Sequence, residues 1–455
     1  MINPFKRIFT AVLAGIMLST ASLCGSLITL RAGAAETMEG MKDYQIINPY
    51  ESVNWASYGQ YKANFHAHTT ESLDDGVSSP KDMIEDHYKK GYDILAITDH
   101  DFLSTTWNRK DRNPYNYLSD ERLNEINTGI DRNGRGMIGV PFSNEQSIPA
   151  HLNTFWANFN NEAGATLESN IAKCEELGGI SHINHPGGAA KMHFEDSEIK
   201  GFVNLYLKYP SCVGMEILNK RYANLEIWRV LWDKVLMNTM PERPVWGFSN
   251  DDTHYVYQTG YNFNLMLMPK NTEESIRYSM ENGTFYAVAL FAKSLYGEEF
   301  EAPDSFPVIN NIEVHQEENS ITITGENYDV IEWVADNKII ATGHSIDLNN
   351  YEDMVNSYIR AQLKGPGGLS FTQPFGIIEK TYTKFGDING DKVINSTDFV
   401  LLKRHILSMD GYILNGESLL AADVDGSGKL DSLDLVYMRR YILRMITNFP
   451  AVQIG

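Results

Sequence analysis

The segment Asn64–Gly76, NFHAHTTESLDDG, is the part of the sequence that decides the fold. It overlaps the end of a predicted strand, Lys62–His66, and carries the pair His66 and His68. Alternate residues of an extended segment point to the same side, so both imidazoles can reach one metal ion. The segment therefore predicts a metal site at the end of the first strand of a larger sheet.

Other residues of the same chemical kind also accompany predicted strands. Nine of the twelve histidines lie between His66 and His254. Further strands are expected at Ile94–Thr98, Met137–Phe142, His151–Phe155, Gly179–Ile183, Val213–Leu218, Val245–Phe248 and Thr284–Ala289. The candidate ligands that follow strand ends are His100, Glu145, His185, Asp252 and His254, whereas His151 opens a strand. Because the carboxyl ends of barrel strands converge on one face, we expect these side chains to form one site.

The strands alternate with helical stretches such as Pro80–Lys90, which ends before Gly91. This rhythm predicts an α/β barrel over residues 44–297. Imidazole and carboxylate donors together suit zinc, manganese or iron, since magnesium and calcium prefer oxygen ligands alone.

Five motifs in order resemble those of the polymerase and histidinol phosphatase (PHP) family. They are NFHAHTTESLDDG at 64–76, ITDHD at Ile97–Asp101, the isolated Glu145, His185-Pro186, and D-x-H at Asp252–His254. The resemblance implies a distorted, TIM-like (β/α)7 barrel that holds two or three metal ions and hydrolyses phosphate esters.

The resemblance also implies which residues bind the ions. One ion would be held by His66, His68, Glu145 and Asp252, a second by Glu145 as a bridge with His151 and His185, and a third by Asp75, His100 and His254. The implied catalytic residues are His66, His68, His100, Glu145, Asp252 and His254. Because Leu73 and Asp74 lengthen the turn before Asp75, Asp74 is an alternative ligand.

Several polar residues near these motifs have less specific roles. His182 and His193 are alternates for which supporting or surface positions are preferred, and Glu216 is expected to orient a ligand. Asp99 could orient His100. For Lys220 and Arg221, surface charge is favoured over contact with a phosphate.

The expected chemistry needs no nucleophilic side chain. The sequence contains no G-x-S-x-G elbow. Two close cations lower the pKa of a shared water, so that hydroxide forms near neutral pH, and they stabilise charge on the leaving oxygen.

Residues 306–378 read as a small β-sandwich packed on the barrel. Short strands are expected at Ile312–His315, Ser320–Thr324, Ile331–Ala335, Ile339–Thr342 and Tyr358–Leu363. Carbohydrate binding through Trp333 or Tyr358 is an alternative to a packing role. A linker, residues 379–385, is expected to follow.

Residues 386–449 contain two loops with calcium-type spacing. Oxygen ligands at loop positions 1, 3, 5, 9 and 12 and a backbone carbonyl at position 7 suit this ion. The first loop offers Asp387, Asn389, Asp391, Val393, Asn395 and Asp398, and the second offers Asp423, Asp425, Ser427, Lys429, Asp431 and Asp434. Each loop leads into an amphipathic helix, at Phe399–Leu407 and Leu435–Leu443, and no helix is expected before either loop.

This duplicated loop and helix resembles a type I dockerin, which implies two bound calcium ions and a cohesin domain of a scaffold protein as partner. The residues that would contact cohesin are Ser396, Thr397, Lys403 and Arg404 in one copy and Ser432, Leu433, Arg439 and Arg440 in the other. Leu433 makes the two faces unequal, and Lys392 stands where a glycine is usual.

Residues 1–35 have the pattern of an export signal. Lys6 and Arg7 precede an apolar run that ends near Ala32-Gly33-Ala34, a small-residue cleavage site. A retained membrane anchor is the alternative, because the run is long enough to span a bilayer. Removal of the signal leaves Cys174 and Cys212, too few for a disulfide framework. We therefore expect a secreted, extracellular protein that does not bind membranes after cleavage.

The net charge of −21 argues against a nucleic-acid partner, which would require a basic surface. Three functional hypotheses follow. The first is a secreted metal-dependent phosphoesterase attached to a cellulosome, acting on a small-molecule or carbohydrate-linked ester. The second keeps the metal site but acts on a plant-wall carbohydrate ester or another polysaccharide-related bond. The third is a binding module without catalysis.

Overall fold

A computed structural model describes residues 42–72, 74–188, 191–220, 225–290, 305–380, 385–391, 393–409 and 411–453. The expected export signal, Leu73, Arg221 and Lys392 lie outside these described residues. Within them, no helix has the length and apolar character needed to cross a membrane.

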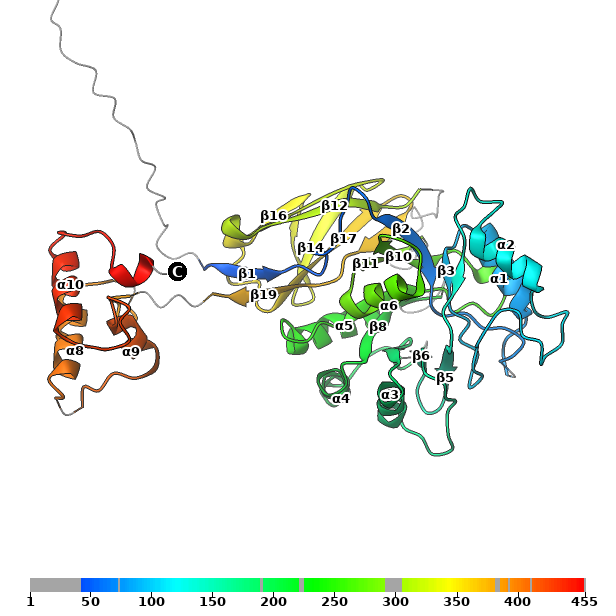
Figure 1. Cartoon of the computed structure of the whole chain (residues 1–455), viewed down its shortest axis with the longest axis horizontal. Coiled ribbons are helices and arrows are strands. Elements are labelled where there is room, and N and C mark those ends of the chain that lie inside the picture. Colours follow the sequence, from blue (N-terminus) through cyan, green and yellow to red (C-terminus); the bar gives the residue numbers. More distant parts are fainter. Residues whose placement is uncertain are drawn as a thin grey trace, which may run out of the picture. The chain divides into compact units, whose positions relative to one another are not determined.

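The largest sheet has eleven strands and contains the first predicted strand (Figure 1). Its main order is β1 (Tyr44–Ile47), β19 (Phe375–Glu379), β17 (Tyr358–Gly365), β18 (Gly368–Phe371), β11 (Phe285–Ala289), β10 (Asn262–Met268), β2 (Gly59–Asn64), β3 (Ile94–Leu95) and β4 (Ile138–Gly139). Only the pairs β2–β3 and β3–β4 are parallel. The other pairs of this sheet are antiparallel, so it differs from the wall of a regular α/β barrel, in which neighbouring strands are parallel.

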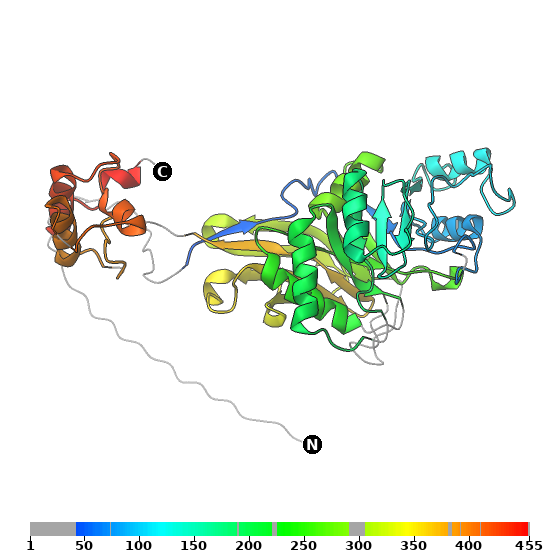
Figure 2. The same cartoon turned by 90° about the horizontal axis from the view of Figure 1, so that it is seen from below.

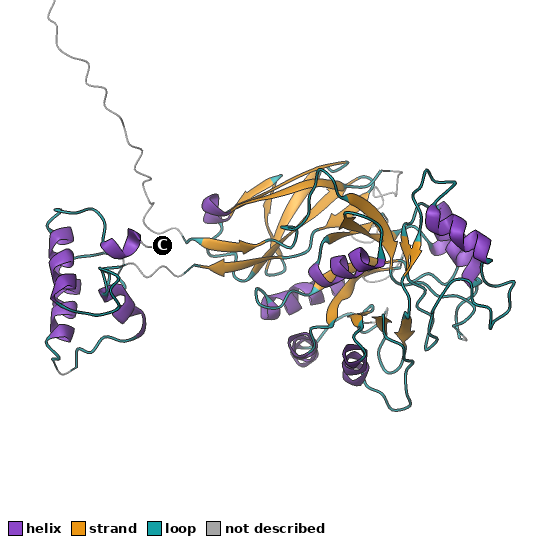
Figure 3. Ribbon diagram, in the orientation of Figure 1, coloured by secondary structure: helices purple, strands orange, loops and turns teal. Residues whose placement is uncertain are grey.

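A second sheet of five strands carries the other half of the predicted ligands. Its order is β5 (Asn144–Gln146), β6 (Leu152–Phe155), β7 (Ile180–Ile183), β8 (Cys212–Asn219) and β9 (Trp246–Asn250). β8 is buried along its whole length, as expected for a parallel strand covered on both faces. The helices α3 (Leu167–Glu176), α4 (Asp196–Lys208) and α5 (Leu225–Thr239) lie outside the strands (Figure 3).

The two sheets do not close into one continuous barrel among the described residues. Three isolated bridges occur instead, and two of them, Ala67 with Thr253 and His100 with Glu145, lie at the predicted ligands. Beside these bridges the backbone leaves the extended conformation, with φ of 48° at Asp252 and 49° at Asp101. A residue with positive φ cannot continue a regular ladder, so the barrel is interrupted where the predicted ligands lie.

Helices on the large sheet follow their sequence signals. α1 (Pro80–Lys89) begins after Ser79, whose side chain accepts a hydrogen bond from the Asp82 backbone N–H. α2 (Asp120–Thr128) lies beside it in both views, and Arg122 on α2 forms an ion pair with Glu85 on α1 (Figures 1 and 2). α6 (Glu273–Asn282) joins β10 to β11.

The segment expected to form a separate sandwich is continuous with the large sheet. β18 pairs with β11, and β17 pairs with β18 and with β14 (Val330–Ala335), which in turn pairs with β15 (Lys338–Thr342). A sheet of three strands, β12 (Val308–His315), β13 (Ser320–Glu326) and β16 (Ser345–Asp347), shares one apolar core with this layer. The segment therefore has two layers, but one of them belongs to the same sheet as β2 and β3.

The C-terminal region has a hydrophobic core of its own, which includes Leu402, Val424, Met438 and Phe449. Its helices are α8 (Ser396–Ile406), α9 (Gly416–Ala422) and α10 (Ser432–Ile442). The expectation that no helix precedes the loops is wrong for the second loop, because α9 ends just before Asp423. Its sequence, GESLLAA, favours a helix but is too short to show an amphipathic period.

Candidate metal centre

The predicted ligands are carried by the ends of strands in two different sheets. His66 and His68 follow β2, and Asp252 and His254 follow β9. Glu145 lies within the short strand β5. His151 precedes β6, His185 follows β7, and His100 follows β3. The two isolated bridges bring these ends together.

His66 and His68 turn their Nε2 atoms toward each other at 3.0 Å. His66 Nδ1 lies 2.8 Å from Glu216 Oε1, and since a carboxylate only accepts, Nδ1 carries the proton. His68 Nδ1 lies 3.2 Å from Ser72 Oγ, whose hydroxyl donates to Asp99. Both Nε2 atoms therefore present lone pairs to the same space.

Two carboxylates enter the same space. Glu145 Oε2 lies 3.2 Å from His66 Nε2 and 3.3 Å from His68 Nε2. Asp252 Oδ1 lies 3.5 Å and 3.2 Å from the same two nitrogens. When both imidazoles are neutral, four hydrogen-bond acceptors converge here, an arrangement that a bound cation satisfies.

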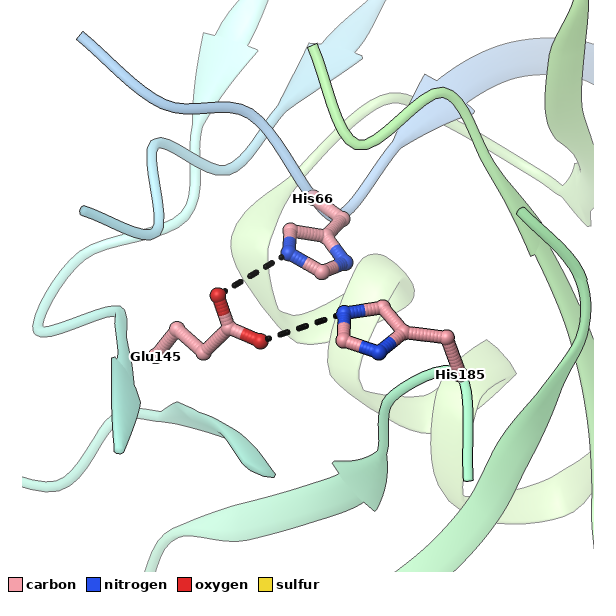
Figure 4. Close-up of side chains that lie close together, drawn as sticks. All are labelled: His66, Glu145 and His185. Carbon is pink, nitrogen blue, oxygen red and sulfur yellow. Dashed lines mark hydrogen bonds and ion pairs between the residues drawn. The ribbon is translucent and has the colours of Figure 1, made fainter. Parts of the chain in front are cut away.

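Glu145 is placed as a bridge between groups of histidines (Figure 4). Its Oε1 lies 2.8 Å from His151 Nδ1 and 3.6 Å from His185 Nε2. Its Oε2 faces His66, His68 and His100, with His100 Nε2 at 2.9 Å. One carboxylate therefore contacts all of the predicted histidine ligands except His254.

The third predicted group is only partly separate. His254 Nε2 lies 2.7 Å from Asp75 Oδ2, and this pair adjoins His68. His100 is 3.6 Å from Asp75 but 3.0 Å from Asp74, so both aspartates stay within reach of a cation. His100 also contacts Glu145, and it thus lies between the first and third groups.

The electrostatics of the cluster show why it needs positive charge. Burial alone would raise the pKa of Glu145, yet His66, His100, His151 and His185 hold that pKa well below its usual value. Burial would lower the pKa of His66, but Asp252, Glu145 and Glu216 raise it well above the ordinary value. The carboxylates therefore remain ionised and attract cations, either protons on the imidazoles or metal ions.

The donor set fits the metals expected from the sequence. Groups of three ligand atoms lie within 4.8 Å of one another in several combinations, among them His66–His68–Asp252 and His66–Glu145–His185. Mixed nitrogen and oxygen donors of this kind suit zinc, manganese or iron.

Supporting residues fix the ligands in place. Glu216 accepts from His66, from the backbone N–H of His185 and from Asn250, which agrees with the orienting role expected for it. Asp99 does not act on His100 directly. Its buried carboxylate accepts from Thr69 and Ser72, and Ser72 in turn contacts His68 and the backbone N–H of His100.

No sequence pattern singled out Ser72 or Asn184. Asn184 Nδ2 donates to Glu145 Oε1 at 2.7 Å. Its position next to His185 was the only available signal. His182 is buried against Phe248, outside the metal-type groups named here, and His193 is exposed. Both positions fit the supporting or surface roles preferred for them.

The C-terminal loops fold around buried aspartates. Asp398 accepts from the backbone N–H groups of Ile388, Asn389 and Asn395, and Asp434 accepts from those of Asp425 and Asp431. The remaining predicted calcium ligands lie along the same loops. Asp423, for example, accepts from Ser427 and Gly428.

The residues expected to contact cohesin lie at the beginnings and along the outer faces of α8 and α10. Arg404 is half-buried over the Tyr412 ring, and the others are exposed: Ser396, Thr397, Lys403, Ser432, Leu433, Arg439 and Arg440.

Fold and site together define a mixed α/β protein with a histidine- and carboxylate-rich candidate metal centre and a C-terminal module with paired aspartate loops. Residues 385–443 match the family model of the dockerin type I domain. This C-terminal segment therefore matches a type I dockerin domain.

Three solved structures are similar to parts of the chain. A two-domain protein from Bacteroides vulgatus, described as containing a predicted PHP-like metal-dependent phosphoesterase, is 15% identical, and the match covers 75% of this chain and 91% of that one with a TM-score of 0.38. An amidohydrolase from Chromobacterium violaceum is 13% identical over 42% of this chain and 87% of that one, with a TM-score of 0.29. A type I cohesin–dockerin complex from Clostridium thermocellum is 38% identical over 14% of this chain and 94% of that one, with a TM-score of 0.14.

Proposed function

We propose that the protein is a metal-dependent phosphoesterase, exported from the cell and held on a cohesin-bearing scaffold by its dockerin domain. One observation carries the catalytic part. The two oxygens of Glu145 face different histidines, with Asp252 beside them, so the site can hold at least two cations close together. Divalent ions bound there would supply a hydroxide nucleophile near neutral pH and stabilise charge on the phosphoryl and leaving oxygens.

Ser72 gives no support for a serine nucleophile. Its hydroxyl donates to Asp99, and its oxygen accepts from His68 and from the His100 backbone N–H, so neither lone pair is free to attack a substrate. The side chains of the site instead position ions: Glu216 orients His66, and Asp99 acts on His68 through Ser72.

The test is hydrolysis of an aryl phosphate by protein loaded with zinc, manganese or iron. Glu145→Gln should lose metal and at least ~100-fold of the rate, because the bridging charge is removed. Glu168→Gln is the matched control, since Glu168 is a surface carboxylate paired with Lys208. Turnover of an aryl acetate without turnover of the phosphate by metal-loaded protein would contradict the proposal.

A second candidate keeps the metal centre but acts on a plant-wall carbohydrate ester or another polysaccharide-related bond. The dockerin favours it, because attachment to a scaffold brings the site to an extracellular surface. Acetylated and feruloylated oligosaccharides assayed beside the phosphate separate the two. A non-catalytic binding module would contain little transition metal after purification.

Attachment is tested separately. The full chain should bind a type I cohesin with calcium and lose that binding in a chelator. Asp398→Ala and Asp434→Ala together should have the same effect, because each removes a buried carboxylate from one loop.

A further inference from the structure

Lys220 is an unusual neighbour for a cluster of this composition. It is the first residue after β8, and its Nζ lies 3.0 Å from Asp252 Oδ2. Among the ion pairs of the described residues, this is the one in which a lysine or arginine contacts a carboxylate of the metal cluster. Lys220 is exposed, as the surface role favoured from the sequence expects, but it also contacts a buried carboxylate of the cluster.

The backbone is held in a costly conformation to reach this position. Lys220 has φ of 49°, a region that lysine rarely adopts. Its carbonyl accepts a hydrogen bond from Asn262 Nδ2 at 3.1 Å. Strain of this kind persists where surrounding contacts enforce it, and it is concentrated at functional sites.

The Lys220 ammonium and the His66–His68 pair contact different oxygens of Asp252. Oδ1 faces His66 and His68, whereas Oδ2 faces Lys220 and His185, with His185 Nε2 at 3.6 Å. The Lys220 side chain is 44% exposed, while Asp252 is 3% exposed. An anion that approaches the cluster from solvent can therefore reach the ammonium before it reaches the carboxylate.

We propose that the Lys220 ammonium binds the phosphoryl group of the substrate and thereby favours phosphate monoesters over uncharged esters. This inference rests on the proposed phosphoesterase function. A lysine contributes a mobile point charge and up to three donors to phosphate oxygens. A metal ion on Asp252 would satisfy that carboxylate and leave the ammonium available to the ligand.

The test measures the binding of inorganic phosphate to metal-loaded protein by titration calorimetry. Lys220→Met should weaken binding at least ~10-fold, and Lys220→Arg should restore most of it, because a guanidinium retains the charge and the donors. The KM for an aryl phosphate should rise in parallel, with a smaller change in kcat. Metal content and melting temperature are measured on the same samples.

The matched control is Lys173→Met. Lys173 is 42% exposed and its Nζ lies 3.0 Å from Glu176, nearly the same exposure and ion-pair distance as Lys220 but on α3. This variant should bind phosphate as the wild type does. If Lys220→Met unfolds, Lys220→Gln replaces it and keeps a donor for Asp252.

Three results would overturn the inference. Unchanged phosphate affinity in Lys220→Met would show that the ammonium only neutralises Asp252. Loss of metal from that variant would show that Lys220 holds the metal centre together. The third result is metal-loaded wild-type protein that neither binds phosphate nor cleaves phosphate esters. It would overturn the proposed function as well, and it is distinguished from the first two because it is seen in the wild type and not in Lys220→Met.

Discussion

At the scale of single residues, the site depends on carboxylates that orient ligands as much as on the ligands themselves. Glu216 fixes the proton of His66 on Nδ1, and Asp99 does the same for His68 through Ser72. Each contact leaves an Nε2 lone pair directed into the cluster. Loss of such an outer contact changes the geometry of a ligand without removing it.

Glu216→Gln should lower metal affinity by roughly 10- to 100-fold while the protein stays folded. The amide oxygen can still accept from His66, but the amide nitrogen cannot accept from the His185 backbone as Oε2 does. Competition with a chromophoric chelator measures the affinity. Glu168→Gln should leave it unchanged, and equal affinity in both variants would refute the orienting role.

The candidate ligands could be selected from the sequence because most of them stand beside a recognisable strand end, and their binding of metal stays a prediction. The supporting residues could not be selected in this way. Ser72 is an isolated serine in a turn, and the approach of Lys220 to Asp252 depends on two residues with positive φ in distant parts of the chain. No local pattern encodes such a contact.

A buried histidine outside the metal cluster predicts part of the pH dependence of stability. Burial lowers the pKa of His87 to about 3, and its ring lies between Met83 O and Asn64 Nδ2. The unfolded chain titrates near the ordinary value of 6.5 and so binds the proton more readily. The contribution of His87 to the free energy of unfolding is therefore fully present above pH 6.5 and is lost as the pH falls from 6.5 to 3.

At pH 5 proton uptake by His87 in the unfolded chain should lower the free energy of unfolding by about 2 kcal/mol relative to pH 7. His87→Gln removes the titration, so urea unfolding of this variant at the two pH values should differ by less than it does in the wild type. His344→Gln, at an exposed position, serves as control. Equal pH dependence in His87→Gln and wild type would show that His87 is not the group responsible.

At the scale of helices and strands, the sequence predicted where elements lie along the chain better than it predicted which strands pair with one another. Pro80–Lys90 was expected as a helix and α1 spans Pro80–Lys89. The strand expected at Ile94–Thr98 is short, because only Ile94 and Leu95 pair before the chain turns toward His100. Antiparallel pairing of β10 and β11 depends on long-range contacts, which a local apolar run does not reveal.

A buried ion pair joins β17 to α5. Arg360 Nη2 lies 2.6 Å from Asp233 Oδ2, Tyr358 donates to the same carboxylate, and both charged side chains are almost fully buried. Arg360→Met should destabilise the protein by about 3–5 kcal/mol, because Asp233 is left as an uncompensated buried charge. Urea unfolding measures the loss.

The double variant Asp233→Leu/Arg360→Met should be more stable than Arg360→Met, since no charge then remains buried. A double variant that is less stable than the single one would show that packing around α5, and not the unpaired charge, causes the loss.

At the scale of the whole molecule, the division of the chain into separate domains stays a prediction from the sequence. The contacts between strands and helices indicate where one of its boundaries is expected. β18 completes the sheet beside β11, and Leu369 and Phe371 share a core with Trp228 and Trp232 of α5. Residues 385–449 contain a separate core. We therefore expect the boundary between two independently stable units near residue 380 and not near residue 305.

A chain ended after Lys380 should keep the melting temperature and metal content of the corresponding transition of the full protein. A chain ended after residue 305 should be insoluble, because it exposes the paired edge of β11 and the apolar core beneath β17. Calorimetry and sedimentation compare the two. A soluble shorter chain that binds metal would establish an independent barrel domain.

The pairing of β1 with β19 sets the order of assembly. Asp43 and Lys380, at the ends of these strands, are 337 positions apart in the chain and contact each other. Contacts so distant in sequence form late in folding. We therefore expect the β1–β19 edge to close only once residue 380 is available to the folding chain, after pairs of nearby strands such as β10 and β11 have formed.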